Sequence, residues 1–214
     1  MEIKGSNLAP AGDTRIWQSS DFLNNQLPVQ LDSVSVRVNG KAAYVYYISP
    51  TQVNILTPPD TLPASANVLL TVNGVASPAF TAQTQPLSTS FFVFSEGYVI
   101  ATHLNGSLIG PTTLYPGAST PAMPNKEVVI YANGFGPTNV PVISGAIAQS
   151  GTLSPPPVIQ IGGVTANVIF AGLVAPGEFQ FNVVIPSSLA TGDQSIVATY
   201  GGASTQPTTL ITIQ

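Results

Sequence analysis

The sequence contains no cysteine among its 214 residues, which excludes disulfides, thiol catalysis and cysteine-based metal sites. It contains a single histidine, His103, and one histidine cannot supply the three or four protein ligands of a zinc site. It also has no run of about 18 apolar residues, the length that a membrane-spanning helix needs. These shortages predict a protein without a cysteine- or histidine-based metal site and without a membrane span, and we expect no cofactor.

Charge is scarce as well. Charged residues make up 7% of the chain, against about 25% in an average soluble domain. The five basic residues are scattered, at Lys4, Arg15, Arg37, Lys41 and Lys126. Because nucleic-acid binding depends on clustered Lys and Arg, we expect no nucleic-acid partner. The net charge of −4 exerts little long-range steering.

Catalytic constellations are also missing from the sequence. No Gly-x-Ser-x-Gly motif surrounds a serine, and His103 lies two residues before an Asn-Gly pair, so we interpret it as a hairpin residue. The nine acidic residues stand apart from one another, mostly beside turns, and do not predict a glycosidase pair. No Asp-x-Asp-x-Asp-Gly loop is present, although loop carbonyls could still bind calcium. The sequence predicts that the protein is not an enzyme.

Turn residues and short strand-like runs are abundant. The chain has 20 prolines and 19 glycines, and no segment keeps a helical apolar period. Strands are predicted at residues 34–38, 68–72, 128–131 and 208–213, and a hairpin at residues 101–109. Asn-Gly, which suits two-residue hairpin turns, occurs at Asn39-Gly40, Asn73-Gly74, Asn105-Gly106 and Asn133-Gly134. This pattern predicts an all-β protein.

The chain repeats itself. Five blocks align in the same order, namely residues 3–10 with 130–137, 36–40 with 159–163, 43–47 with 166–170, 52–55 with 180–183, and 71–74 with 199–202. Such order is typical of internal duplication. We therefore predict two tandem immunoglobulin-like β-sandwich domains, residues 1–87 and 88–214. The second would carry an extra N-terminal hairpin and an ordered Pro-rich surface loop at residues 111–124.

Comparing the copies separates buried from exposed positions. Alternate side chains of a strand share one face, so positions that are apolar in both copies should form the buried face. These positions are Ala43, Val45 and Tyr47 in the first copy and Ala166, Val168 and Phe170 in the second. Tyr44 aligns with Asn167, and we expect it to face solvent or a neighbour.

A polar pair also recurs, as Gln52-x-Asn54 and Gln180-x-Asn182. The pairs could form a repeated polar stripe that contacts a ligand. The alternative, which we favour, is that these amides satisfy backbone groups on the solvated face of a strand.

The order of turns and strands resembles the IPT/TIG type of immunoglobulin-like domain. The whole chain is similar to an uncharacterised tandem module at the C-termini of large secreted bacterial proteins, common in acidobacteria. The matching segments are residues 5–10, 47–54, 104–108, 130–137 and 161–164. The resemblance implies an extracellular or cell-surface location and a non-catalytic role beside other domains of a parent protein. The start at Met1, without a signal peptide, adds the expectation that the chain is a piece of a larger protein.

Aromatic residues are the best candidates for ligand binding. Trp17, Phe22, Tyr44 and Tyr46 lie in or near the long loop and second strand of the first copy. Aromatic rings suit both sugars and protein interfaces. The alternative, which we favour, is that Trp17 and Phe22 close the end of the sandwich and Tyr46 packs between domains. We predict a structural or interaction module, such as a spacer, anchor or adhesion-type domain pair. The rival is a carbohydrate-binding module that uses these aromatics, and the partner would be a surface protein or a polysaccharide.

Overall fold

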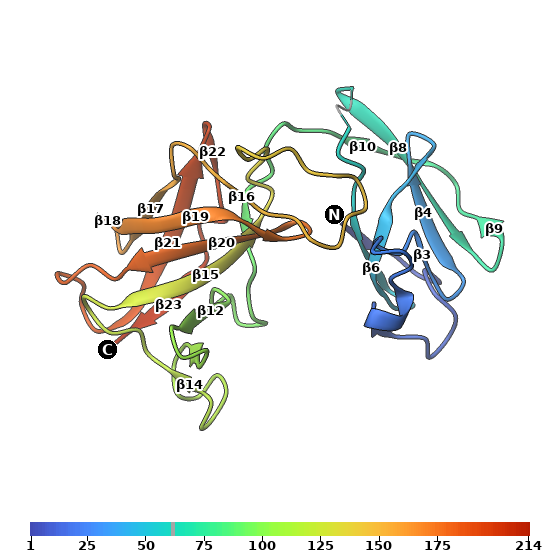
Figure 1. The fold of residues 1–214 in the computed structure, drawn as a ribbon. Helices are drawn as coiled ribbons and strands as arrows, with labels where there is room; N and C mark the ends of the chain where they lie inside the picture. The colour runs from blue at the N-terminus through green and yellow to red at the C-terminus, as the bar shows by residue number, and fades with distance from the viewer. Residues whose placement is uncertain (61–62) are drawn as a thin grey trace. The chain divides into compact units, whose positions relative to one another are not determined.

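The computed structural model describes residues 1–60 and 63–214, and the fold is all-β (Figure 1). The chain divides into two compact units: unit 1 comprises residues 1–85 and 142–149, and unit 2 comprises residues 86–141 and 150–214. Segment 142–149, which the sequence placed in the second domain, therefore packs with unit 1. That residues 1–87 and 88–214 fold as two independent domains stays a prediction. Among the described residues, no helix is long and apolar enough to cross a membrane.

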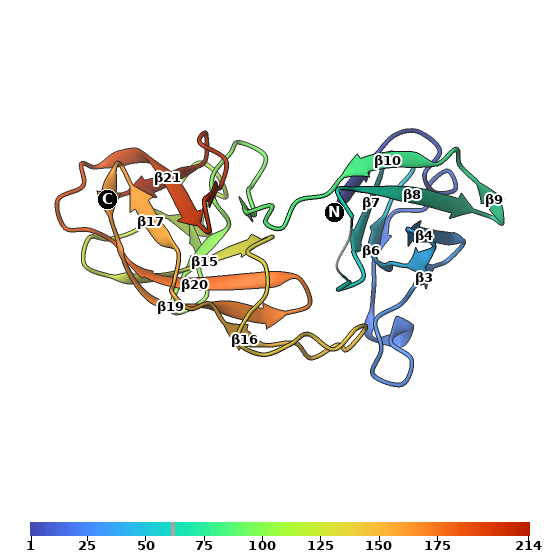
Figure 2. The same ribbon diagram turned by 90° about the horizontal axis from the view of Figure 1, so that it is seen from above.

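Unit 1 has two antiparallel sheets around one core. The first sheet contains, in order, β1 (Glu2–Lys4), β7 (Gln52–Leu56), β6 (Tyr44–Ile48) and β2 (Arg15–Ile16). The second contains β10 (Phe80–Gln83), β8 (Ser65–Val72), β4 (Val34–Val38) and β3 (Gln30–Leu31), with β5 (Lys41–Ala42) on β4 and β9 (Val75–Ala76) on β8. Figure 2 shows β8 and β10 side by side. The buried residues come from both sheets, among them Val36, Val45, Val53 and Leu70, so the unit is a β-sandwich.

Unit 2 is built in the same way, with additions. Its larger sheet contains β14 (Ser119–Thr120), β13 (Leu108–Ile109), β12 (Ala101–His103), β15 (Glu127–Asn133), β20 (Glu178–Val184), β19 (Asn167–Ala175) and β16 (Gly151–Thr152), with β11 (Ser90–Phe91) on β15. The other contains β18 (Val164–Thr165), β17 (Val158–Ile161), β21 (Gly192–Tyr200) and β22 (Ala203–Ser204), with β23 (Leu210–Ile213) on β21. The expected strands and the 101–109 hairpin are thus confirmed. The Pro-rich loop contributes β14, which pairs in parallel with β13.

Strand registers in the two units agree at the aligned positions. The facing residues are Ile3–Val53 in unit 1 and Ile130–Phe181 in unit 2 for one sheet, and Val36–Leu70 and Ile159–Ala198 for the other. Because register fixes which side chains reach the core, this agreement confirms the internal duplication and the immunoglobulin-like architecture of both copies.

Three of the six burial predictions are wrong, because Tyr47, Val168 and Phe170 are only half-buried. Ala43 and Val45 are fully buried, but the next core residue is Ile48, and Tyr47 is only half-buried. A β-bulge between Val45 and Tyr47 inserts one residue opposite β7 and so shifts the alternation. The second copy repeats this feature between Val168 and Phe170, both half-buried. A shared bulge is further evidence that the two copies have one architecture.

Three of the four Asn-Gly pairs lie in the expected hairpin turns, and one of these is Asn105-Gly106, which joins β12 to β13. Asn39 and Gly40 have φ angles of 49° and 79°, as a two-residue hairpin turn requires, and Asn73-Gly74 is equivalent. By contrast, Asn133 is the last residue of β15 rather than part of a turn. The next residue, Gly134, lies directly against the Ser88 carbonyl. A Cβ at this position would collide with that carbonyl, so glycine is required here.

Candidate functional site

Three of the four candidate aromatics come together in unit 1. The ring centroids of Trp17 and Phe22 lie 5.5 Å apart, and those of Trp17 and Tyr46 lie 4.9 Å apart, both with edge-to-face geometry. This geometry is favourable for aromatic rings. Trp17 also packs against the core of unit 1, whereas Tyr46 is 40% exposed. We call Trp17, Phe22 and Tyr46 the aromatic cluster; Trp17 and Phe22 are half-buried, and Tyr46 is its accessible side.

Local backbone structure brings these rings together. Strand β2 pairs with β6 through Ile16 and Tyr47, and the Trp17 amide donates to the Tyr46 carbonyl at 2.9 Å. A short 3-10 helix, η1 (Ser19–Asp21), then turns the chain, and Phe22 caps its end. Because Tyr46 is the extra residue of the bulge in β6, its ring can lie against Trp17 while its neighbour Val45 stays in the core.

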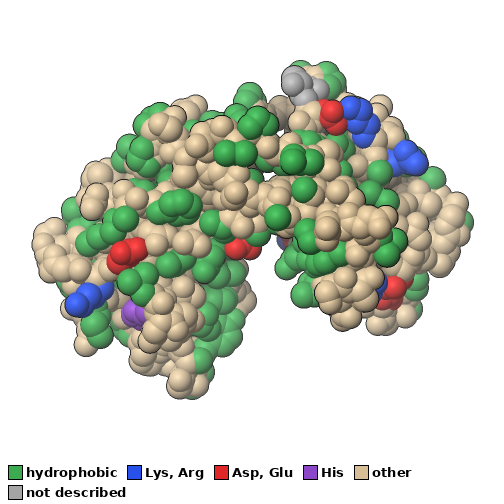
Figure 3. Space-filling view, viewed as in Figure 1, with side chains coloured by type: hydrophobic (Ala, Val, Ile, Leu, Met, Phe, Trp, Pro, Cys, Tyr) green, Lys and Arg blue, Asp and Glu red, His purple; other side chains and the backbone are tan. Residues whose placement is uncertain are grey.

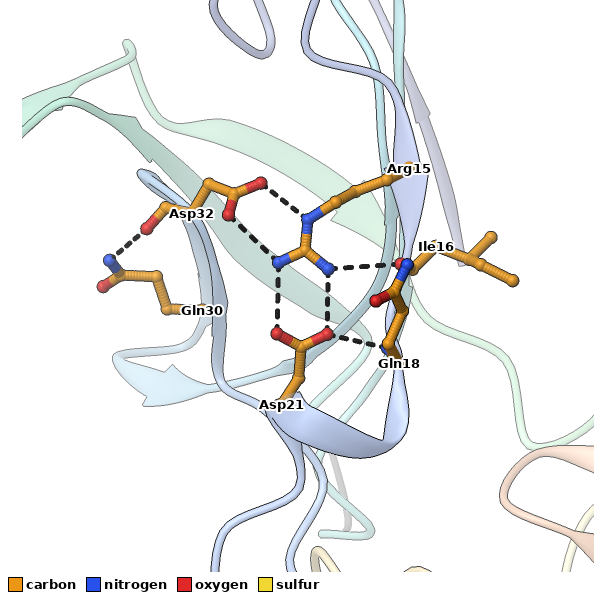
Figure 4. A network of polar contacts seen from close by, with 6 residues as sticks. All are labelled: Arg15, Ile16, Gln18, Asp21, Gln30 and Asp32. Carbon is orange, nitrogen blue, oxygen red and sulfur yellow. Dashed lines mark hydrogen bonds and ion pairs between the residues drawn. The ribbon is translucent and has the colours of Figure 1, made fainter.

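Arg15 fixes the loop that carries the cluster (Figure 4). Its Nε and Nη2 donate to Asp32 at 2.7 and 3.0 Å. Its Nη1 and Nη2 donate to Asp21 at 2.8 and 3.1 Å. One guanidinium thus binds two carboxylates, each in bidentate fashion, which is the strongest ion-pair geometry available to arginine. Asp21 belongs to η1 and Asp32 follows β3, so Arg15 ties the aromatic loop to the second sheet.

These contacts also shift the proton affinities of the network. The hydrogen bonds from Arg15 hold the pKa of Asp21 and that of Asp32 below their ordinary value, and they raise the pKa of Arg15 further. Asp21 accepts a further hydrogen bond from the Gln18 amide at 2.7 Å. All three groups are therefore charged at neutral pH, so the ion pairs hold the loop in place there.

Tyr44 is engaged elsewhere. Its hydroxyl lies 2.6 Å from Ser144 Oγ. Gly145 lies so close to the Tyr44 ring that a Cβ there would be 2.9 Å from the hydroxyl. The Leu27 amide donates to the Gly145 carbonyl at 2.7 Å, so segment 142–149 is held over Tyr44. The interpretation of Tyr44 as a residue that faces a neighbour fits this contact, and Tyr44 is not part of the aromatic cluster.

Sequence reasoning missed the Arg15 network. The acidic residues were expected to be isolated, but Asp21 and Asp32 share one guanidinium, and the expectation was wrong for this pair. A signal was available: Arg15 is one of five basic residues in the whole chain and stands two positions before the only tryptophan, Trp17.

The repeated amide pairs bond to themselves. Gln52 Nε2 donates to Asn54 Oδ1 at 2.9 Å, and Gln180 Nε2 donates to Asn182 Oδ1 at 2.7 Å. The expectation that they satisfy backbone groups was wrong, because the partners are side chains. Asn182 also donates to Glu127 at 2.8 Å. These contacts are side-chain hydrogen bonds on the outer face of each sheet.

The remaining candidate for chemistry, His103, is a hairpin residue, as expected. It lies in β12, and its Nε2 is 3.0 Å from Thr120 Oγ1. Among the described residues, no group of three or more His, Cys, Asp or Glu side chains is placed to hold a metal ion.

One family model matches part of the chain. Residues 1–90 match the model of the IPT/TIG domain. No curated protein matches the chain. One similar solved structure is the SGBP-B protein of the mixed-linkage glucan utilization locus of Bacteroides ovatus, in complex with a mixed-linkage heptasaccharide. Its identity is 13% and its TM-score 0.31; the alignment covers 86% of this chain and 37% of that one. The chain thus spans little more than a third of that protein.

Proposed function

We propose that this chain is a non-catalytic interaction module, a spacer, anchor or adhesion-type domain pair of a larger secreted or surface protein, and that it binds its partner through the aromatic cluster of unit 1. The observation that supports this most is that the rings of Phe22 and Tyr46 both pack on Trp17, in a region whose loop is locked by Arg15. A preformed aromatic surface loses little conformational entropy on binding. Tyr and Trp are also the residues most often found at the centre of binding sites.

The charge distribution indicates which partners fit. Arg15 is already neutralised by Asp21 and Asp32. Figure 3 shows a face on which charged side chains are few and apolar side chains are common. Such a surface favours an uncharged partner. The partner would be a surface protein or, as the second candidate, a neutral polysaccharide, whose sugar rings can stack on Tyr46. The adjacent domains of a parent protein would bring the module to that partner.

A binding array tests this proposal. The full chain is probed against immobilised glycans, cell-wall polymers and bacterial surface proteins, beside the variants Trp17→Ala and Tyr46→Ala. The matched control is Tyr115→Ala in unit 2, because Tyr115 is also 40% exposed and also forms an edge-to-face pair, with Phe94 at 5.1 Å.

The expected result is specific binding that Tyr46→Ala and Trp17→Ala remove and Tyr115→Ala leaves intact. Binding to a glycan would identify the carbohydrate alternative, and binding to a protein would identify the adhesion alternative. Equal binding by all variants would contradict the proposed site.

A further inference from the structure

The first strand of unit 1 has a free edge, which the equivalent strand of unit 2 lacks. Strand β1 ends its sheet and pairs only with β7 among the described strands. Its counterpart β15 pairs with β20 on one side and with β11 and β12 on the other. The edge that one copy covers is therefore open in the other, and an unpaired edge is a template for another strand.

The backbone groups on that edge can be assigned. The Met1 carbonyl accepts from the Ile55 amide at 2.9 Å, and the Gly5 amide donates to the Thr51 carbonyl at 3.1 Å. Because backbone groups alternate between the two edges of a strand, those of Glu2 and Lys4 point to the free edge. Unit 2 supports this assignment: the outward carbonyl of Tyr131, which aligns with Lys4, accepts from the Phe92 amide at 3.0 Å, and its outward amide donates to the Ile100 carbonyl at 3.1 Å.

The segment that leads into β11 of unit 2, residues 86–89, would not fit over unit 1 in the same place. In unit 2, residues 86–89 pass over three glycines, and Cβ atoms at Gly134, Gly136 and Gly201 would meet Ser88 or Leu87. The aligned residues of unit 1 are Asn7, Ala9 and Asn73, whose side chains block that path. A strand that binds unit 1 must therefore lie along residues 2–4.

Charge along this edge selects a partner. Glu2 and Lys4 lie on one face of β1, 46% and 74% exposed, with an ion-pair distance of 3.2 Å. In an antiparallel pair of two β1 strands centred on Ile3, Glu2 of each strand faces Lys4 of the other. The same register places their outward backbone groups opposite each other, as hydrogen-bonded pairs require. Shifting the register by two residues in either direction puts Glu2 opposite Glu2 or Lys4 opposite Lys4, which is unfavourable.

We propose that β1 is a self-association edge, through which a second copy of this chain adds its own β1 in antiparallel orientation about a twofold axis. Glu2 and Lys4 set the register. An isologous contact of this kind is the commonest form of homodimer. Because a three-residue strand buries little area, the dimer is a weak one, with a dissociation constant of roughly 0.1–1 mM.

Charge reversal tests the proposal. The self-association of the full chain is measured by sedimentation velocity over a concentration series, with Lys4→Glu, Glu2→Lys and the double variant. Each single variant places only like charges across the edge and should weaken association about tenfold. The double variant restores opposite charges and should associate like the parent chain. A mixture of the two single variants should form a heterodimer, which also shows that both are folded.

Amide exchange locates the contact independently. The Glu2 and Lys4 amides should gain protection as concentration rises, while the Met1–β7 side of the strand stays unchanged. A chain that stays monomeric up to about 1 mM overturns the proposal. So does a dimer whose strength is the same in both single variants and in their mixture.

Discussion

Removing the Arg15 side chain should destabilise unit 1 by about 2 kcal/mol. The side chains of Arg15 and Asp21 are 26% and 19% exposed, and that of Asp32 is 44% exposed. Hydrogen bonds to charged groups contribute about 1.5–3 kcal/mol when shielded, whereas an exposed ion pair contributes about 0.2–1 kcal/mol. The Asp21 contact thus accounts for roughly 1.5 kcal/mol and the Asp32 contact for roughly 0.5 kcal/mol. For a domain of this size, the melting temperature should fall by about 10 °C.

The assay is thermal unfolding followed by tryptophan fluorescence. Trp17 is the only tryptophan and lies in the loop that Arg15 holds, so its signal reports on unit 1. Arg15→Lys is the matched variant: it keeps the charge but cannot bind two carboxylates in bidentate fashion, and it should retain less than half of the stabilisation. A melting temperature of Arg15→Ala within about 2 °C of the parent chain would refute the reasoning, since it corresponds to less than about 0.5 kcal/mol.

The acid dependence supplies a second check. The pKa of Asp21 and that of Asp32 are lowered in the folded protein. Their contribution is therefore fully present above the unfolded pKa of about 3.9 and is lost as the pH falls through the folded pKa. The difference in melting temperature between the parent chain and Arg15→Ala should be constant near neutral pH and should shrink below about pH 4. A difference that persists in strong acid would mean that Arg15 acts through packing rather than charge.

Two further predictions concern unit 2. Gly134→Ala should destabilise the protein by about 3 kcal/mol or more, because its Cβ would collide with the Ser88 carbonyl. Gly163→Ala, whose φ of 77° is similar but whose Cβ would meet nothing, should cost only about 1–2 kcal/mol, and equal losses in urea unfolding would disprove the collision. Tyr98 donates to Asp193 at 2.8 Å, and this bond raises the pKa of Tyr98. Its stabilisation is present below the unfolded pKa of about 10 and is lost as the pH rises through the folded pKa. Tyr98→Phe should therefore melt earlier than the parent chain at pH 8 but not in strong alkali, and a gap that is independent of pH would contradict this.

Local signals explain what the sequence could predict. Strand alternation and the Asn39-Gly40 turn depend only on residues that are neighbours in the sequence. Because the chain contains two copies, the burial predicted for a position in one copy can be checked against the aligned position in the other. Burial at Ala43 and Val45 was predicted correctly for that reason. The burial of Tyr47 was predicted wrongly. A β-bulge depends on how a strand pairs with its neighbour, and the alternation of residues along one strand gives no sign of it.

The candidate site was predictable only in its aromatic residues. Trp17, Phe22 and Tyr46 stand out by residue type, but their packing depends on the bulge and on η1. The Arg15–Asp32 contact joins residues 17 positions apart, and the Tyr44–Ser144 contact joins residues 100 positions apart. No sequence period records such contacts, because tertiary folding alone brings these residues together.

The central claim is that the aromatic cluster of unit 1 is the binding surface, and a spectroscopic titration tests it most directly. The isotope-labelled chain is titrated with a partner from the binding array, while the indole resonance of Trp17 and the amide of Tyr46 are compared with the amide of Tyr115. The account predicts saturable shifts at Trp17 and Tyr46 and none at Tyr115. Shifts confined to unit 2, with Trp17 unmoved at saturation, would contradict it.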